Sequence, residues 1–366
     1  MGLVLDRVDK VVGRDIHLHS IELALEPGSR NVILGRTLAG KTSLLRILAG
    51  LDKPTRGRIL IDEKDVTGVS VRKRSVAMVY QQFINYPSLT VYKNIASPLK
   101  LAGAKKSEID HKVRRIAEML HIQDLLDRLP SQLSGGQQQR TAIARALIKE
   151  TQLLLLDEPL VNLDYKLREE LRIELQQIFK QRSAIVVYTT TEPSEALMMG
   201  GNIVVMDEGR ILQSGPTTEV FRHPVTTRVA EIFSDPPINF IPGQVRQDRV
   251  WIGGRIQLKM AGHMLGLAEG DYTFGLRCNH LFLKATTSED MEIKTVVELS
   301  EINGSETFIH VTFDDHKLVV QDDGVHQLNI GRKISLFVNP CHFFVFDKEG
   351  RLTASPETHC NRSRSF

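Results

Sequence analysis

Apolar runs and amphipathic stretches alternate along the first two thirds of the chain. The start is rich in β-forming residues at 3–5 and 21–25, and four later apolar runs have the length of buried strands: 31–34, 152–156, 184–188 and 203–206. Helical patterns lie between them, at 41–48, 105–128, 137–149 and 165–181. Buried strands that alternate with helices predict an α/β fold with a mostly parallel sheet.

The pattern changes near residues 234–237, where two consecutive prolines discourage a helix. Beyond them the sequence predicts short strands with frequent turns, at 249–252, 256–259, 274–277, 295–299, 307–313, 317–320 and 333–338. This pattern favours a small antiparallel barrel or sandwich. We therefore predict a first domain at 1–235, a second at 236–356 and a disordered polar tail at 357–366.

Composition narrows the class of protein. Hydrophobic residues make up 42% and charged residues 25% of the chain, as in globular proteins. The 47 Lys and Arg against 44 Asp and Glu leave a charge of +3, which argues against a nucleic-acid partner. The three cysteines have no metal-binding spacing and fit a reducing compartment. No apolar run is long enough to cross a bilayer, so we expect a cytoplasmic chain that reaches a membrane only through a partner.

Residues 35–42 read Gly-Arg-Thr-Leu-Ala-Gly-Lys-Thr and match the phosphate-loop pattern G-x-x-x-x-G-K-S/T. The match lies between a predicted strand and a predicted helix, a setting that disfavours an accidental glycine loop. Backbone N–H groups and the helix N-terminus would face phosphates, Lys41 would add charge, and the Thr42 hydroxyl would bind Mg²⁺. The predicted nucleotide-binding residues are Arg36, Thr37, Leu38, Ala39, Gly40, Lys41, Thr42 and Ser43.

Two acidic residues follow the apolar run 152–156. Such a strand would deliver Asp157 to the Mg²⁺ and Glu158 to the attacking water. A solvated Asp-Glu turn is the alternative, but the upstream phosphate loop gives the paired carboxylates a role.

Three further motifs decide the family that the chain resembles. Residues 133–140, Leu-Ser-Gly-Gly-Gln-Gln-Gln-Arg, resemble the signature of ATP-binding-cassette (ABC) ATPases. Gln81 lies in a stretch similar to their glutamine loop, and residues 160–164 resemble their D-loop. These motifs come in the family's order and extend over residues 1 to about 235.

The resemblance implies a P-loop NTPase core with a helical subdomain at about 88–150. Two such domains would sandwich two ATP molecules with Mg²⁺. Gln81 would join Thr42 and Asp157 at the metal, and Glu158 and Gln81 would serve catalysis. The residues expected to complete the site of the opposite subunit are Ser134, Gly135, Gly136, Gln137 and Asp164. The implied partners are a second ATPase subunit, two transmembrane permease subunits and, indirectly, an extracytoplasmic solute-binding protein, at the cytoplasmic face of the inner membrane.

Residues 235–243, 274–281 and 331–347 resemble the oligonucleotide-binding-like (TOBE) regulatory domain of carbohydrate-importer ATPases. Residues 35–43 and 80–90 are similar to one of two ATPase chains of bacterial glycerol importers. This resemblance implies import of glycerol or a related polyol or sugar. The alternatives are a homodimeric sugar or glycerol-3-phosphate importer and an ATP-binding scaffold with little turnover. A soluble cassette protein of DNA repair or translation fits less well, because the chain has one signature and no coiled-coil insertion.

Four residues depart from the family pattern. Thr191 falls where the family has a histidine, Val12 where it has an aromatic residue, Val161 replaces a serine and Leu38 a glycine. Losing one preorganised transition-state contact costs about 10²–10³ in rate, and losing base stacking costs roughly 1–3 kcal/mol. Because all four bear on the chain's own site, we expect that site to be slow or inactive while the signature completes the site of a different ATPase chain.

Overall fold

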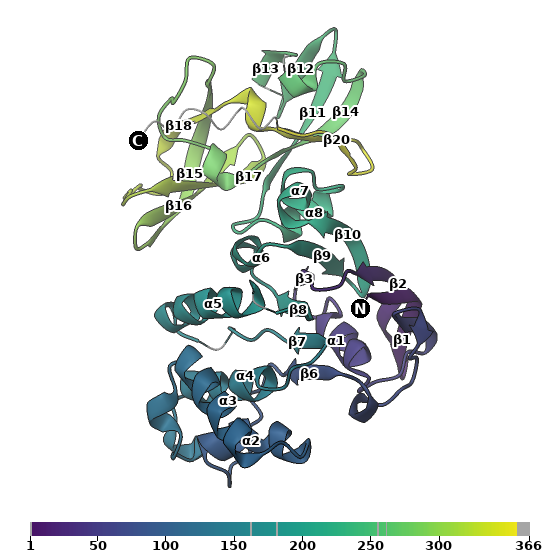
Figure 1. Cartoon of the computed structure of the whole chain (residues 1–366). Coiled ribbons are helices and arrows are strands. Elements are labelled where there is room, and N and C mark those ends of the chain that lie inside the picture. Colours follow the sequence, from purple (N-terminus) through teal and green to yellow (C-terminus); the bar gives the residue numbers. More distant parts are fainter. Residues whose placement is uncertain (1, 162, 181, 255, 261, 357–366) are drawn as a thin grey trace. The chain divides into compact units, whose positions relative to one another are not determined.

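The computed structural model describes residues 2–356 except 162, 181, 255 and 261, so the predicted tail at 357–366 lies outside the described residues. The chain divides after Thr217 into two compact units, which are described separately below. Figure 1 traces the elements of each unit in chain order.

A six-stranded sheet forms the centre of the first unit, in the order β10-β9-β3-β8-β7-β6. Five of its strands are parallel, and β10 pairs antiparallel with β9. The predicted α/β fold with a mostly parallel sheet is confirmed. The bounds are β3 (Arg30–Leu34), β6 (Val76–Val79), β7 (Leu153–Leu156), β8 (Ile185–Thr190), β9 (Asn202–Asp207) and β10 (Arg210–Pro216).

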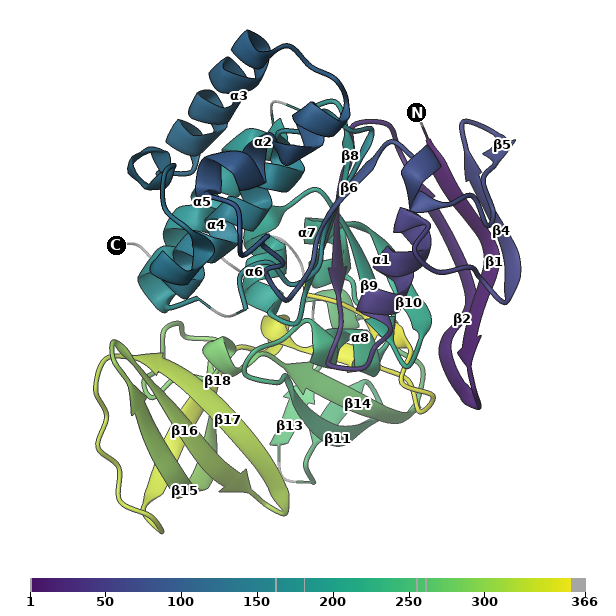
Figure 2. The ribbon, with the colours of Figure 1, turned by 90° about the horizontal axis from the view of Figure 1, so that it is seen from below.

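A second sheet of the first unit is antiparallel, in the order β2-β1-β4-β5. Its strands are β1 (Leu3–Val12), β2 (Asp15–Leu25), β4 (Arg56–Ile61) and β5 (Lys64–Asp65), of which the sequence indicated only parts of the first two. Helix α1 (Lys41–Ala49) lies between the two sheets, and one hydrophobic core joins all three (Figure 2). This core fixes the helix that begins directly after the phosphate loop.

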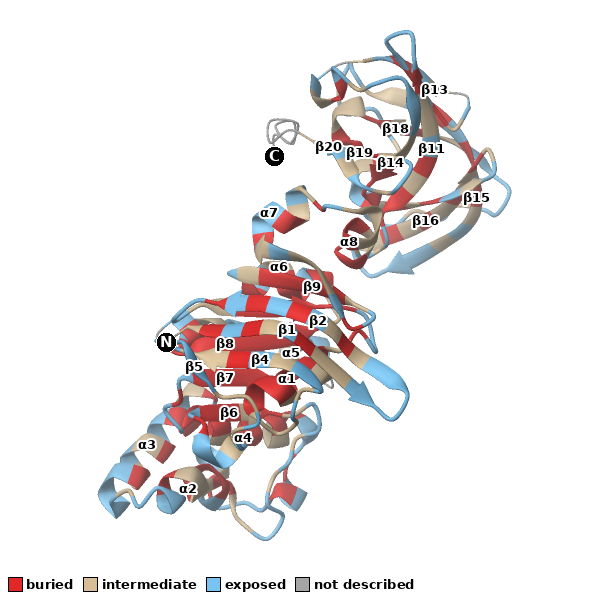
Figure 3. Cartoon of the chain, turned by 90° about the vertical axis from the view of Figure 1, so that its right-hand side faces the viewer, coloured by how far each residue is buried: buried red, intermediate tan, exposed pale blue. Residues whose placement is uncertain are grey.

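Four helices of the first unit lie near the predicted stretches 41–48, 105–128, 137–149 and 165–181, whereas the helices at 91–101 and 193–199 were not predicted individually. Their bounds are α2 (Val91–Leu101), α3 (Lys106–Met119), α4 (Gly135–Leu147), α5 (Tyr165–Lys180) and α6 (Pro193–Met199), with 3-10 turns at Val71–Lys73, Gln123–Leu125 and Pro130–Gln132. The predicted helical stretch 105–128 is not one continuous helix. Helix α3 ends at Met119, and a 3-10 turn at Gln123–Leu125 follows it. In Figure 3 the strands β7 and β8 are buried throughout, whereas α3 is exposed along one face.

The second unit contains two antiparallel sheets, in the orders β13-β12-β11-β14-β19-β20 and β17-β16-β15-β18. The strands of the first are β11 (Asn239–Arg246), β12 (Arg249–Ile252), β13 (Ile256–Lys259), β14 (Gly270–Leu276), β19 (Phe344–Phe346) and β20 (Leu352–Ala354). Those of the second are β15 (Met291–Asn303), β16 (Glu306–Phe313), β17 (His316–Asp323) and β18 (Lys333–Val338). Short 3-10 turns occur at Gly262–Met264, Cys278–His280 and Pro340–His342. The two sheets share one hydrophobic core.

The second unit begins earlier than the predicted boundary at residue 235. Two short helices, α7 (Thr217–Arg222) and α8 (Thr227–Ile232), precede its strands. The buried Arg277, just after β14, donates hydrogen bonds to the carbonyl oxygens of Phe221 and Phe233 at 2.7 and 3.3 Å. Ala230 of α8 also packs with Phe344 and Phe346. These contacts tie both helices to the β-rich unit, although the prolines that follow suggested a later boundary.

Candidate nucleotide site

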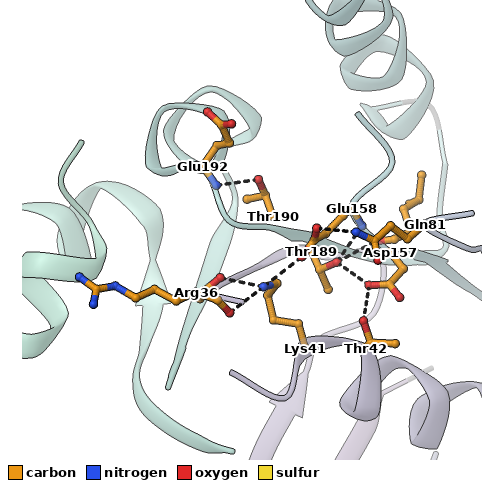
Figure 4. Close-up of polar contacts among 11 residues, drawn as sticks. Arg36, Lys41, Thr42, Gln81, Asp157, Glu158, Thr189, Thr190 and Glu192 are labelled. Carbon is orange, nitrogen blue, oxygen red and sulfur yellow. Dashed lines mark hydrogen bonds and ion pairs between the residues drawn. The ribbon is translucent and has the colours of Figure 1, made fainter. Parts of the chain in front are cut away.

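The predicted phosphate-binding and acidic residues meet at one edge of the parallel sheet. The phosphate loop follows β3, Gln81 lies shortly after β6, Asp157 and Glu158 follow β7, and Thr189 lies near the end of β8. Carboxyl ends of parallel strands are the usual place for ligands in open α/β sheets. Figure 4 shows the side chains of Lys41, Thr42, Gln81, Asp157, Glu158 and Thr189 lying together, although their segments are far apart in the sequence.

Lys41 lies at the centre of this edge and is only 4% exposed. Its Nζ donates to the carbonyl oxygens of Gly35 at 2.8 Å and Arg36 at 3.0 Å, and forms an ion pair with Glu158 Oε1 at 3.0 Å. The Arg36 side chain points away from the cluster, so this residue contributes its backbone (Figure 4). A buried ammonium held by loop carbonyls and one carboxylate is positioned to meet an anion that enters the loop.

Asp157 connects the start of α1 with β8. Its Oδ1 accepts from the Thr42 hydroxyl at 3.1 Å and from the Thr189 hydroxyl at 3.0 Å. Burial raises the pKa of the Asp157 carboxyl, while the hydrogen bonds from Thr42 and Thr189 lower it in part. A hydroxyl beside a buried carboxylate is the oxygen donor set that Mg²⁺ uses together with phosphate oxygens. The residues present therefore fit a magnesium–nucleotide complex.

Glu158 is held from three sides. Its backbone N–H donates to Thr189 Oγ1 at 2.9 Å, Gln81 Nε2 donates to its Oε2 at 3.1 Å, and Lys41 pairs with its Oε1. Its φ of 43° is in the left-handed region, which is uncommon for residues with a side chain. This backbone turn presents the carboxylate beside Lys41, and Gln81 joins the same network.

Thr189 was not among the predicted site residues, although it contacts both acids. A polar residue near the end of an otherwise apolar run was the available signal in the sequence. The resemblance drew attention to position 191 instead. Thr191 is half-buried and comes directly after β8, before α6 begins at Pro193.

The loop backbone explains two positions of the motif. Leu38 has a φ of 70° and its side chain is 94% exposed. Gly40 has a φ of 96°, and a Cβ there would lie 2.7 Å from the carbonyl oxygen of His17. Glycine suits both positions, so leucine at 38 carries a backbone conformation that side chains disfavour.

The remaining loop residues differ in exposure. Thr37 is exposed, whereas Ala39 is buried at 2%. Ser43, in the first turn of α1, lies 3.1 Å from the ring nitrogen Nδ1 of His17. Thr37 and Leu38 are therefore exposed on the outer side of the loop, whereas Ala39 and Ser43 anchor its inner side to the rest of the protein.

The signature residues form the beginning of α4. Ser134 caps the helix: its Oγ accepts from the N–H of Gln137 at 3.4 Å, and Gln137 Oε1 accepts from the N–H of Ser134 at 3.0 Å. This reciprocal cap explains why the helix begins at Gly135, before the predicted start at 137. A Cβ on Gly136 would lie 2.0 Å from Leu167 Cδ2, so a larger residue there would require the Leu167 side chain of α5 to move.

The other predicted positions lie apart from these contacts. Asp164 precedes α5 and accepts from the N–H of Leu167 at 2.9 Å. Val12 ends β1 opposite Asp15 and is 49% exposed. Val161 is 36% exposed, and its neighbour at 162 in the D-loop stretch lies outside the described residues.

Comparison with known proteins agrees with this geometry. Residues 18–161 match the family model described as ABC transporter. The trehalose/maltose import ATP-binding protein MalK of Thermococcus litoralis is 36% identical over 95% of this chain and 98% of the relative. The sn-glycerol-3-phosphate import ATP-binding protein UgpC of Chromohalobacter salexigens is 37% identical over 91% of this chain and 90% of the relative.

The chain belongs to the ABC transporter ATPase family. Its first part is similar to a solved dimeric ATP-binding cassette in a post-hydrolysis state with ADP and Pi, with 28% identity and a TM-score of 0.53 over 59% of this chain and 98% of that one. A second similar structure is cbiO1 of Clostridium perfringens, also 28% identical, with a TM-score of 0.54 over 60% of this chain and 90% of that one. The resemblance read from the signature is thus confirmed, and the chain is an ATP-binding ATPase.

Within the described part of the chain, no helix combines the length and the apolar character needed to cross a bilayer.

Proposed function

We propose that this ABC ATPase powers an importer for a sugar or for glycerol-3-phosphate. Curated relatives that match over more than nine tenths of the chain are named for trehalose/maltose, maltose/maltodextrin and sn-glycerol-3-phosphate import. These names support the alternative solutes of the sequence analysis better than glycerol itself. The observation that carries an energy-coupling role is the convergence of Lys41, Thr42, Asp157, Glu158 and Gln81 at one sheet edge.

Each of these residues has a role that its position supports. Lys41 binds the β- and γ-phosphates by exchanging the Glu158 carboxylate for phosphate oxygens. Thr42, Asp157 and Gln81 hold Mg²⁺, which neutralises charge on the phosphates when bound. Released from Lys41, Glu158 orients the water that attacks the γ-phosphate, and Thr189 keeps both acids in place.

The signature residues act on the nucleotide of a second ATPase domain. Ser134 and Gln137 stand at the start of a capped helix, where N–H groups favour phosphate. The similar cassette that was solved with ADP and Pi is described as dimeric, which supports this arrangement. In the complete importer, two permease subunits would hold the ATPase pair at the cytoplasmic face of the inner membrane, and a solute-binding protein would deliver the solute from outside.

We further propose that the chain's own site turns over slowly. At position 191 a threonine cannot supply a cationic ring to the γ-phosphate, and at position 12 an exposed valine offers no aromatic face to adenine. Pairing with a different ATPase chain would leave one complete site in the importer. Two copies of this chain would leave two slow sites.

Replacing Thr191 with histidine tests the slow-site proposal. ATP turnover by the purified full-length chain alone, in which every site belongs to this chain, is measured for the wild type, for Thr191→His and for a doubly substituted Thr191→His/Glu158→Gln protein. We expect a rise of about 10²-fold in the single variant and none in the double variant. An unchanged rate in Thr191→His would contradict the proposal that the missing histidine limits this site.

Native mass spectrometry of the tagged importer tests the pairing. A second ATPase chain of different mass supports the mixed pair, whereas two copies of this chain contradict it. Solute identity is tested separately, because stimulation of turnover by a solute-loaded binding protein does not depend on how the ATPase chains pair.

A further inference from the structure

A pocket of about 560 Å³ lies wholly within the second unit, among β11, β12 and β14. Neighbouring positions on these strands, Ile241, Val245, Val250 and Ile252, are buried in the core between the two sheets. Strand side chains alternate between faces, so the residues between these positions belong to the opposite face. The polar and aromatic lining residues are Gln244, Trp251, Asp271, Tyr272, Thr273, His316 and Lys348.

Three of these residues form a row across three adjacent strands. Gln244 on β11 pairs in register with Trp251 on β12 and with Asp271 on β14. Directly opposite residues in antiparallel strands hold their Cβ atoms about 4.5–5.5 Å apart. Gln244 Nε2 donates to Asp271 Oδ1 at 2.7 Å, which fixes the amide and the carboxylate beside the indole. We call Trp251, Gln244 and Asp271 the indole row.

Two glycines line the space beside the indole row. Gly253 and Gly254 follow β12, line the pocket and have φ values of 58° and 72°. A Cβ on Gly253 would lie 2.5 Å from Phe313 Cε1, so the chain passes close to the core there. A Cβ on Gly254 would meet nothing within 4 Å, so this position leaves room for a bound molecule.

The indole row combines an apolar ring with a dense set of hydrogen-bonding groups. Trp251 is 37% exposed, although a large aromatic side chain is normally covered. A carboxylate such as that of Asp271 can accept several hydrogen bonds, of which Gln244 Nε2 supplies one, and the Gln244 amide can both donate and accept. Thr273 adds a hydroxyl, and the volume is in the range of small-molecule sites, about 300–1,000 Å³.

Sugars match this combination, because their rings carry apolar C–H faces and a rim of hydroxyl groups. An anionic ligand would meet the Asp271 carboxylate, and the Lys348 side chain that would balance it is 79% exposed. We propose that this pocket binds a neutral saccharide, with a C–H face on the Trp251 ring and hydroxyl groups on Asp271 and Gln244. This site goes beyond the proposed importer function and does not rest on it, since binding is measured without ATP turnover.

Trp251 is the only tryptophan of the chain, so its fluorescence reports on this pocket alone. The full-length protein, without permease, is titrated with maltose, trehalose, glycerol and glycerol-3-phosphate. We expect a saturable change in emission with at least one of the two disaccharides. Asp271→Asn and Gln244→Ala are each expected to weaken that binding about tenfold or more.

The matched control is Asp248→Asn, which changes an exposed carboxylate in the turn between β11 and β12, outside the pocket lining. It is expected to leave the saccharide titration unchanged. ATP binding and circular dichroism, recorded for every variant, show whether each one is folded. Trp251→Ala removes the reporter, so its saccharide binding is followed by calorimetry and is expected to be lost.

Three results would overturn the proposal. They are no saturable response to either disaccharide, equal affinity in Asp271→Asn and wild type, and a response to glycerol-3-phosphate alone that Lys348→Ala abolishes. The last result would assign the pocket to an anion. A failure of the importer assay with a normal disaccharide titration would reject the proposed function and leave this site standing.

Discussion

In the first unit the site side chains lie just beyond or near the ends of parallel strands, whereas in the second unit the indole row lies within antiparallel strands. The first arrangement gathers charged groups from segments far apart in the sequence, such as Lys41 and Glu158. The second spreads single side chains over a face, such as Trp251 beside Gln244. Strand ends leave backbone groups and loops free to close on phosphates, while a strand face offers flat contact to a ring.

The largest effect is expected for Arg277→Ala, and this substitution tests whether the two units unfold independently. Arg277 is buried, donates to two backbone carbonyls and to Ser234 Oγ, and lies over the Phe221 ring at 3.6 Å. Burial lowers the pKa of Arg277 to about 10, so the group stays charged at neutral pH. We expect Arg277→Ala to lower the free energy of unfolding of the second unit by about 3–4 kcal/mol, because carbonyls lose donors and a cavity forms.

Calorimetry with and without Mg-ATP measures this effect, since ATP stabilises only the transition of the unit that binds it. Arg246→Ala, at an exposed position at the end of β11, is the control and is expected to change little. Equal shifts of both transitions in Arg277→Ala would show that the units unfold together.

The next effect concerns the two acids of the first unit. In Thr189→Val the side chain keeps its volume, but the N–H of Glu158 and the carboxylate of Asp157 both lose a partner. We expect the first unit to lose about 2 kcal/mol of stability and the Mg²⁺ concentration for half-maximal ATP binding to rise.

Thr190→Val is the matched control, because Thr190 is equally buried and its Oγ1 accepts from the N–H of Glu192 instead. It is expected to lower stability without changing the Mg²⁺ dependence. An unchanged Mg²⁺ dependence in Thr189→Val would remove Thr189 from the site.

Much of the first unit could be predicted from sequence because its motifs have fixed spacing along the chain. Residues 35–42, Asp157 and Ser134 each occupy a short segment whose strand–loop–helix context is readable. Thr189 was missed because its role depends on which strands are neighbours in the sheet. A threonine near the end of an apolar run was visible in the sequence, but its contacts with Asp157 and Glu158 cannot be predicted from that local pattern.

In the second unit, strands could be predicted from the sequence, but side-chain neighbours and the domain boundary could not. The pattern of short strands with frequent turns predicted strands such as 249–252 and 333–338, which agree with β12 and β18. The indole row could not be predicted, because it arises from strand register: a shift of one residue would turn Trp251 to the opposite face. The boundary was placed late because the contacts of Arg277 with α7 and α8 span more than 40 positions.

A smaller change in stability is expected for Asp157→Asn, which should stabilise the protein, whereas Arg277→Ala and Thr189→Val should destabilise it. Because burial raises the pKa of this carboxyl, the folded protein holds the proton to higher pH than the unfolded chain does. The stability that the group contributes is therefore present at low pH and is lost as the pH rises through the two pKa values. In the absence of nucleotide, we expect Asp157→Asn to be more stable than wild type at pH 7 by about 1 kcal/mol.

Denaturant unfolding across a pH series measures this difference, which should shrink toward zero in acid. Asp124→Asn, at an exposed position, serves as the control and is expected to change little at any pH. A gain that is the same at pH 4 and pH 7 would show that the Asp157 charge is not its origin. ATP binding by Asp157→Asn should weaken despite its greater stability.

The smallest effect on stability is expected for Leu38→Gly, which introduces the glycine that the family has at position 38. Leu38 is 94% exposed, so glycine removes almost no packing, and its φ of 70° costs leucine about 1–2 kcal/mol. Glycine costs about 0.5–1 kcal/mol in backbone entropy, so Leu38→Gly should raise the free energy of unfolding, measured with denaturant, by about 0.5 kcal/mol. Leu101→Gly, at a similarly exposed leucine at the end of α2, should instead lose stability. A loss in both variants would mean that the loop does not strain Leu38, and the departure at this position would then bear on phosphate contact alone.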